Sequence, residues 1–295
     1  PKETATVIST NFEINVDAAG NITEYFWDFG DNETKTTTEK NVSHIYERSG
    51  NYTVKVNVTD QYGRETSRDF DIKVSTSKEI IETTLDSKIN KAEEFESSLE
   101  KYGFFKTEVL EKYTGFKESK KTLDEINLNY TGDNPEEEMN KLAKKLIEVR
   151  IPSQINKIDY NEQGILSYPV KENIEPGVVS SITGGNYSHE DRSQYISKIE
   201  DWNIVNVENS VSYEKFTIKG GEEDFASFFS ILLDKKASST IGDYFFIIKD
   251  MENMEFDGSN ASKVQGEDYR FLKLSGDKTI TFATTENIDF DKIPY

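Results

Sequence analysis

The stretch FWDFGDNETKTTTEKNVSHIY, residues 26–46, decides how the first part of the chain is interpreted. Tyr25 and Trp27 stand two positions apart, and Val42, His44 and Tyr46 alternate with polar residues. Such alternation is typical of a β-strand with one face buried. The glycine and acidic residues that follow the tryptophan indicate a tight turn. The stretch therefore predicts strands of a small all-β domain.

The neighbouring sequence extends this pattern over residues 4–75. The clearest strand is NYTVKVNVTD, residues 51–60, in which Tyr52, Val54, Val56 and Val58 share one face and polar residues the other. One face should be core and the other solvent. After the turn DQYG, residues 60–63, apolar residues alternate again at Phe70, Ile72 and Val74. These two strands are predicted to form a hairpin.

Three elements in this order, GNITEYFWDFGDN, VSHIY and SGNYTVKVNVTDQYG, resemble the PKD domain, an immunoglobulin-like β-sandwich named after the polycystic kidney disease protein. One departure is Asn32, which stands where the family usually has glycine. Asparagine is the non-glycine residue that best tolerates positive φ, so the turn should survive. The resemblance implies a non-catalytic extracellular spacer or interaction module.

Within this domain we expect Trp27, His44, Tyr46 and Tyr52 to be structural core residues, since a lone histidine on an alternating strand is usually packed and hydrogen-bonded. Asp28, Asp31 and Asn32 gather oxygen atoms in one loop, which suits a hard cation such as calcium. Their spacing matches no EF-hand. Acidic turn residues also commonly bond nearby backbone amides, so both roles stay open.

Residues 77–152 change to helical periodicity. Apolar residues recur at spacings of three and four, at Ile81, Leu85, Ile89, Ala92, Phe95, Leu99 and Tyr102, and again from Val109 to Val149. Gly103 and Gly115 should interrupt the helices. We expect a helical hairpin or bundle. A self-association seam is the alternative.

Residues 153–295 are predicted to form an α+β domain with an antiparallel sheet. A helix should carry Tyr195, Ile196, Ile199 and Trp202. A hairpin turns at Gly220 and Gly221, with a bulge expected between Tyr213 and Phe216 because the apolar parity changes there.

The apolar run 244–248 predicts a central strand buried on both faces. A last hairpin is expected around SGDK, residues 275–278. The region faintly resembles the membrane-proximal domains of archaeal surface proteins, and no functional residue is carried over.

The composition of the chain argues against several classes of binding partner and site. The net charge is -20, which argues against nucleic acid and anionic membranes. There are no cysteines, which excludes disulfides and cysteine-based sites. No apolar run is long enough for a membrane helix, and the chain opens with Pro1, so we expect a processed or excised soluble piece whose signal peptide or anchor lies outside it.

Glycosylation sequons occur at Asn21, Asn32, Asn41, Asn51, Asn57, Asn129, Asn186 and Asn260.

Motifs of catalysis are absent from the sequence: it has no nucleophile elbow, P-loop, dinucleotide fingerprint or zinc-protease motif. Only His44 and His189 could serve as histidine bases. The 55 acidic residues leave a glycosidase pair open, but both tryptophans have core interpretations. We therefore expect no enzyme and no cofactor, with calcium as the open case.

The leading hypothesis is a non-catalytic extracellular cell-surface protein with a structural, adhesive or self-assembly role, as a surface-layer or filament component. Its partners would be other copies or other surface proteins. The alternative is a substrate-binding or spacer module of a secreted hydrolase, which would bind polysaccharide or protein. Membrane association is expected only through an anchor outside this chain.

Overall fold

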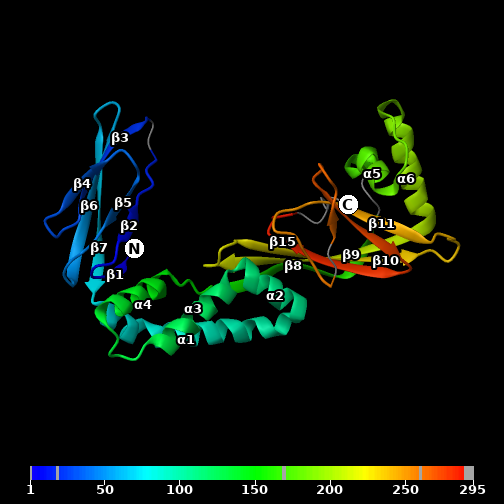
Figure 1. The fold of residues 1–295 in the computed structure, drawn as a ribbon. Helices are drawn as coiled ribbons and strands as arrows, with labels where there is room; N and C mark the ends of the chain where they lie inside the picture. Colours follow the sequence, from blue (N-terminus) through cyan, green and yellow to red (C-terminus); the bar gives the residue numbers. More distant parts are fainter. Residues whose placement is uncertain (1, 18–19, 168–170, 259–260, 289–295) are drawn as a thin grey trace. The chain divides into compact units, whose positions relative to one another are not determined.

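The computed structural model describes residues 2–17, 20–167, 171–258 and 261–288 (Figure 1). The chain divides into two compact units, Pro1–Glu94 with Lys117–Ile151, and Phe95–Phe116 with Pro152–Tyr295. The helices that we expected as a separate domain at 77–152 are thus shared between the units. The physical reason is that aromatic residues of the middle segment pack on the sheet of the second unit, as shown below.

The first unit begins with a β-sandwich. One sheet has the order β1-β7-β6-β3-β4, and a second pairs β2 with β5. The strands are β1 (Glu3–Ala5), β2 (Thr10–Glu13), β3 (Ile22–Asp28), β4 (Thr34–Thr37), β5 (Asn41–His44), β6 (Gly50–Asp60) and β7 (Glu65–Ser75). Strands β6 and β7 form the expected hairpin, with Val54, Val56 and Val58 buried in the core. The alternating pattern therefore predicted the buried face of β6.

Side chains of the opening stretch hold the loop after β3 against the end of β5. The Phe29 ring stacks on His44 with centroids 3.9 Å apart, and His44 Nε2 lies 2.7 Å from Asp31 Oδ2. The Tyr46 hydroxyl donates to the Phe29 carbonyl at 3.0 Å. Trp27 and Tyr46 are fully buried, His44 is 7% exposed and Tyr52 is half-buried. The spaced motifs thus form one aromatic and hydrogen-bonded cluster.

The turn between β6 and β7 is organised by one carboxylate. Asp60 Oδ1 accepts hydrogen bonds from the backbone N–H groups of Tyr62 and Arg64, at 2.9 and 3.0 Å, and Oδ2 accepts one from Arg64 Nε at 2.7 Å. The hydrogen bond from the Arg64 side chain lowers the pKa of Asp60 below its ordinary value. The charged form of Asp60 is therefore the one that the turn favours.

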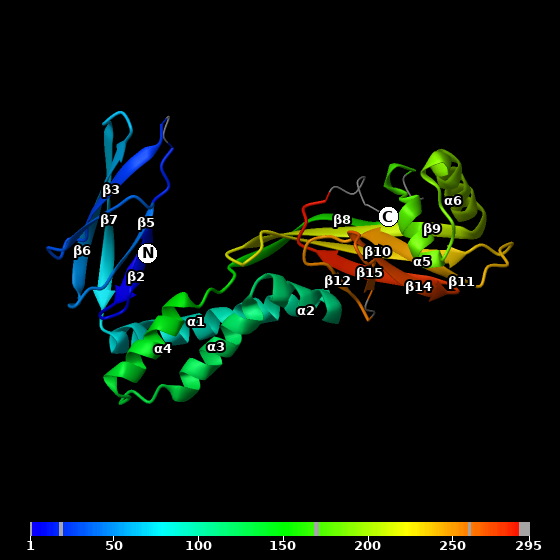
Figure 2. The same cartoon turned by 45° about the horizontal axis from the view of Figure 1, so that its top comes forward.

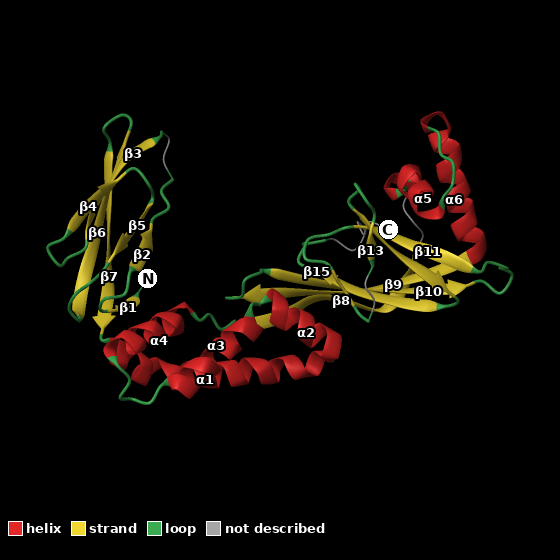
Figure 3. Cartoon of the chain, viewed as in Figure 1, coloured by secondary structure: helices red, strands yellow, loops and turns green. Residues whose placement is uncertain are grey.

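Three helices complete the first unit (Figure 3). They are α1 (Ser77–Leu99), α3 (Phe116–Asn129) and α4 (Glu136–Glu148), of which the last residues of α1 and the first of α3 belong to the second unit. Lys88 of α1 donates to the carbonyls of Leu146 and Val149 at the end of α4, at 2.5 and 2.8 Å. Burial lowers the pKa of Lys88. The lysine satisfies carbonyl groups that a helix end leaves without intrahelical partners.

The second unit contains a five-stranded sheet of order β12-β15-β10-β9-β8 and a three-stranded sheet of order β11-β14-β13 (Figure 2). The strands are β8 (Gln154–Ser167), β9 (Val207–Lys219), β10 (Phe225–Lys235), β11 (Asp243–Lys249), β12 (Glu255–Phe256), β13 (Ser262–Lys263), β14 (Tyr269–Ser275) and β15 (Lys278–Thr284). The helices are α2 (Phe104–Tyr113), α5 (Pro176–Thr183) and α6 (Arg192–Asn206), with short 3-10 turns η1 (Glu100–Tyr102), η2 (Lys171–Asn173) and η3 (His189–Asp191).

Strands β9 and β10 bury apolar side chains on both faces. Tyr213 and Phe229 face the core shared with the three-stranded sheet. On the other face, the Phe216 ring meets Tyr102 at 5.2 Å and the Phe228 ring meets Phe105 at 6.2 Å between centroids. These contacts attach η1 and α2 to the sheet.

Glu214 adds ion pairs on the same face of β9. It pairs with Lys106 of α2 and, at 3.1 Å, with Lys157 of β8. The same face of the sheet therefore gains polar as well as aromatic attachments.

The bulge that we expected between Tyr213 and Phe216 is wrong. Strands β9 and β10 pair in continuous register from Val207 to Thr217. The apolar residues change from one face of β9 to the other because a different element packs against each face. The strand itself is not interrupted. The register shifts lie instead between β8 and β9, where Ile158 is an extra residue.

Two further expectations fail in the same region. Strands β14 and β15 do not form the last hairpin, since the SGDK turn carries the chain from the three-stranded to the five-stranded sheet. Strand β11 is an edge strand and not a central one. Tyr244, Phe246 and Ile248 are buried, whereas Phe245 and Ile247 on the opposite face are only half-buried.

The contact between Asp31 and His44 predicts a stability effect. Asp31→Asn removes the charged partner of His44 and should lower the unfolding free energy of the sandwich by about 1–2 kcal/mol. In a Trp202→Phe background Trp27 is the sole tryptophan, so its emission during urea unfolding reports this unit. Glu33→Gln is the matched control, because Glu33 lies 3.6 Å from His44 Nδ1 and is 69% exposed. Equal losses in the two variants would contradict the assignment.

The lowered pKa of Asp60 predicts a pH dependence. A carboxyl whose folded pKa is lowered contributes stability above its unfolded pKa of about 3.9, and this contribution is lost as pH falls through the folded value. Asp60→Asn should therefore be less stable than the parent at pH 7, with the difference shrinking below about pH 4. The Trp27 emission measures both curves. A difference that stays constant from pH 7 to pH 3 would show that the charge of Asp60 contributes nothing.

Candidate functional site

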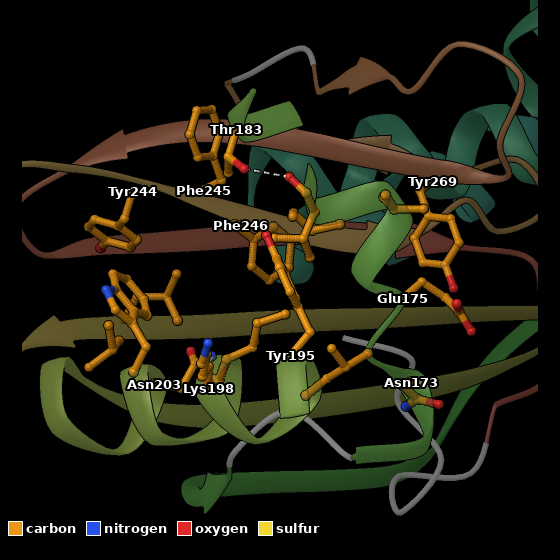
Figure 4. A pocket seen from close by; sticks show the side chains of 18 of the residues that line it. Asn173, Glu175, Thr183, Tyr195, Lys198, Asn203, Tyr244, Phe245, Phe246 and Tyr269 are labelled. Carbon is orange, nitrogen blue, oxygen red and sulfur yellow. Dashed lines mark hydrogen bonds between the residues drawn. The ribbon is translucent and has the colours of Figure 1, made fainter. Parts of the chain in front are cut away.

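The second unit contains a cavity of about 570 Å³. Its described lining comes from α5 and α6 with the turn before α5, and from β9, β10, β11 and the start of β14. Figure 4 shows the labelled residues of α6 and β11 around the cavity, with Phe245 beside Thr183 of α5. This volume is within the range of about 300–1,000 Å³ that ligand-binding clefts occupy.

Aromatic side chains form much of the lining: Tyr195, Trp202, Tyr244, Phe245, Phe246 and Tyr269. We interpreted Trp202 as a core residue, but it is 40% exposed. Helix α6 buries Ile196 and leaves Ile204 and Val205 exposed beside the tryptophan. The helical spacing of the apolar residues was correct, but one flank of α6 borders the cavity instead of a packed core.

Strand β11 supplies one wall along its length. Five consecutive residues, Asp243 to Ile247, line the cavity, whereas its hydrogen-bonded neighbour β14 contributes only Tyr269. Consecutive residues of a strand point to opposite faces, so a space that all five border runs along the strand edge. The order β11-β14-β13 makes this the open edge of the sheet. The half-buried Phe245 and Ile247 are explained by this position.

One polar side chain of the lining is buried without a partner. Asn209 of β9 is only 3% exposed, and its Oδ1 accepts no hydrogen bond from the part of the chain that the structure describes. Buried side-chain acceptors nearly always have a partner, because desolvation otherwise costs free energy. Asn209 is therefore the strongest polar indication of a ligand in this cavity.

Several other polar lining groups have partners of their own. Glu175 pairs with Arg192 at 3.0 Å, Asp243 with Lys273 at 2.7 Å, and the Tyr244 hydroxyl donates to the Gly276 carbonyl at 2.8 Å. Burial raises the pKa of Tyr244 and of Tyr269, and nearby carboxylates raise both further. Both phenols are therefore neutral at physiological pH and remain hydrogen-bond donors.

The residues proposed for calcium are engaged in local contacts. Asp28 Oδ1 accepts from the Gly30 N–H at 2.9 Å, and Asp31 bonds the Glu33 N–H and His44. Asn32 adopts a φ of 74°, the positive value expected for a residue in the position of a glycine. In the described part of the chain no group of three or more histidine or acidic side chains is placed to hold a metal ion. Calcium binding by this loop stays a prediction.

The predicted glycosylation sites lie on the surface where the structure describes them. Asn21, Asn32, Asn41, Asn51, Asn57, Asn129 and Asn186 are exposed, and Asn260 lies outside the described residues. Their exposure permits a glycan but does not test its presence.

No helix among the described residues is both long and apolar enough to cross a membrane.

Comparison with known proteins identifies the first domain. A family model described as PKD domain matches residues 2–74. Collagenase ColQ1 of Bacillus cereus (strain Q1) is 43% identical over 58 residues, which is 20% of this chain and 6% of the collagenase. Collagenase ColA of Bacillus cereus (strain ATCC 14579) is 33% identical over 70 residues, which is 24% of this chain and 7% of that protein. The chain thus spans only a small part of these relatives.

Among solved structures, the PKD1 domain of Vibrio anguillarum Epp is 32% identical. The match covers 23% of this chain and 80% of that domain, with a TM-score of 0.22.

The unpartnered Asn209 predicts an unusual stability effect. Asn209→Leu removes a buried acceptor while keeping similar volume, so it should raise the unfolding free energy of the second unit by about 1 kcal/mol. Hydrogen exchange of the β9 and β10 amides measures this free energy. Asn203→Leu is the control, because Asn203 donates to the Ile199 carbonyl at 3.0 Å and its removal loses a bond. A loss of protection in Asn209→Leu would mean that its side chain stabilises the fold.

Proposed function

Because residues 2–74 are a PKD domain, we propose that this chain is a non-catalytic part of a larger extracellular protein. PKD domains occur as non-catalytic modules of collagenases and metalloproteases. In this proposal the PKD domain acts as a spacer, and the second unit holds a polymer chain in its cavity. The observations that carry the proposal are the match of residues 2–74 to the PKD domain model and the similarity of this chain to two collagenases, over 58 and 70 residues.

The cavity supports the binding role. It combines six aromatic side chains with a buried acceptor that has no described partner, and such combinations of apolar area and few polar groups are typical of binding sites. The polymer would be a polysaccharide or a protein. The proposal therefore corresponds to the substrate-binding alternative that the sequence left open.

The surface-layer, filament and self-assembly roles stay predictions, as do an archaeal origin and glycosylation. One observation bears on self-association: Trp202, Ile204 and Val205 expose apolar surface on one end of α6, at 40%, 51% and 59%. Trp202 and Val205 stand three residues apart and so lie on the same side of the helix, and an exposed apolar patch commonly marks an interaction site. Sedimentation velocity of the parent and of Val205→Lys tests whether this surface joins copies of the chain.

The polymer-binding role predicts retention on an insoluble polymer. The full chain should be retained on at least one of microcrystalline cellulose, chitin and insoluble collagen. Trp202→Ala should reduce retention by about tenfold, because an aromatic contact is worth about 1–3 kcal/mol at a binding site. Pull-down of each variant at a series of polymer concentrations measures the change.

Phe104→Ala is the matched control, since Phe104 is 85% exposed on α2 and does not line the cavity. It should leave retention unchanged. Absence of retention on all three polymers would overturn the polymer-binding role. Equal effects of the two substitutions would show that the cavity is not the binding site.

A further inference from the structure

We propose that the cavity of the second unit binds an extended polypeptide segment, which pairs with the open edge of β11 as an additional strand. This inference rests on the proposed function and names the class of its ligand. It follows from three features of the same cavity: an unpaired strand edge, a floor with a buried acceptor and an apolar wall.

The strand edge is the first feature. Strand β11 pairs with β14 in regular antiparallel register from Asp243 with Ser275 to Lys249 with Tyr269. In an antiparallel pair, alternate residues direct their N–H and C=O groups toward the partner, and the others direct them away from it. No strand of the described chain pairs with β11 on its other side. A row of backbone donors and acceptors thus borders the cavity, which is the arrangement that binds an added strand.

The dimensions of the cavity fit such a segment. The lined part of β11 spans five residues, Asp243 to Ile247. At about 3.3 Å per residue this edge is roughly 16 Å long, enough to pair with about five residues of an added strand. Helices α5 and α6 stand across the cavity from this edge, so the added strand would lie between β11 and the helices. Figures 1 and 2 both show these helices beside β11.

The floor supplies the second feature. Val207 and Asn209 of β9 both line the cavity and are buried at 3% exposure each. Their sheet packs against β11 through a core that includes Val207 of β9 together with Tyr244 and Phe246 of β11. An added strand would therefore lie over β9. One N–H or hydroxyl donor of that strand would satisfy Asn209 Oδ1.

The apolar wall formed by α5 and α6 is the third feature, and it favours a polypeptide over a polysaccharide. Val178, Ile199 and Trp202 present apolar surface from α5 and α6. The carboxylates of Glu175 and Asp243 already pair with basic side chains. A buried sugar chain carries many hydroxyl groups that each need a partner, whereas a strand satisfies its backbone on β11 and places alternate apolar side chains on the wall. With a net charge of -20, the chain favours a neutral or basic segment.

The test uses the full chain and an array of synthetic hexapeptides. The peptides carry Val, Ile, Phe or Tyr at alternate positions and Lys, Ser or Thr between them. The best-retained sequence is then synthesised in two forms, with N-methyl groups on one or the other alternate set of amides. We expect saturable binding, loss of at least about tenfold with one methylated form, and little loss with the other, because only one set of amides pairs with β11.

Protein variants and hydrogen exchange locate the site. Asn209→Leu should weaken binding of the selected peptide by about two- to tenfold without lowering the thermal midpoint. Asn129→Leu, at an exposed asparagine of α3, should change neither. Bound peptide should slow exchange at alternate amides of β11. Retention of no array peptide, equal effects of the two methylated forms, or unchanged exchange in β11 would each overturn the inference.

The results also separate this inference from the proposed function. Retention on cellulose or chitin that Trp202→Ala reduces, together with a negative peptide array, would keep polymer binding and overturn the polypeptide ligand. A positive array without retention on any insoluble polymer would support the strand site and overturn the proposed role in polymer attachment.

Discussion

The need to cover both faces of one hairpin determines the second unit. Strands β9 and β10 carry apolar side chains on each face, and neither face can be left to solvent without losing burial energy. Tyr102 and Phe105 cover one face, which draws residues 95–116 out of the helical region and into this unit. The three-stranded sheet covers the other face. The division of the chain follows from these two requirements.

The sandwich depends on a different kind of contact. Its diagnostic motifs lie far apart in sequence but meet at one point, where Phe29 stacks on His44 and Tyr46 bonds the Phe29 carbonyl. The histidine therefore has a structural explanation for its position in the motif. The negative charge of Asp31 is held 2.7 Å from this histidine, which ties the turn after β3 to the end of β5.

The sequence predicted several elements that have one buried and one exposed face. Strands β6 and β7 follow such an alternation, and the glycine breaks at Gly103 and Gly115 separate helices as expected. The predictions failed where the two faces of a strand contact different parts of the structure. Between Tyr213 and Phe216 the apolar residues change face, as they would at a bulge. The strand is in fact regular, and each face packs against a different part of the unit. The apolar run 244–248 resembles a central strand, but β11 has a core on one face and the cavity along its open edge.

The position of the cavity follows from the same architecture. Three strands are too few to cover the five-stranded sheet, so the second layer ends at β11 above β9. Helices α5 and α6 continue that layer, but a helix cannot pair with a strand edge through its backbone, since its own groups are used internally. A gap beside β11 is the consequence, and Asn209 lies buried at its floor.

An open strand edge is an aggregation hazard that proteins usually cover or interrupt. Here helices α5 and α6 stand beside the edge, and the backbone groups of β11 on that side have no strand partner in the described chain. Helices beside the edge hinder flat pairing with the edge of a second copy, whereas a single extended segment needs less room. Selectivity for one strand would then arise from the helices beside β11 and not from the strand itself.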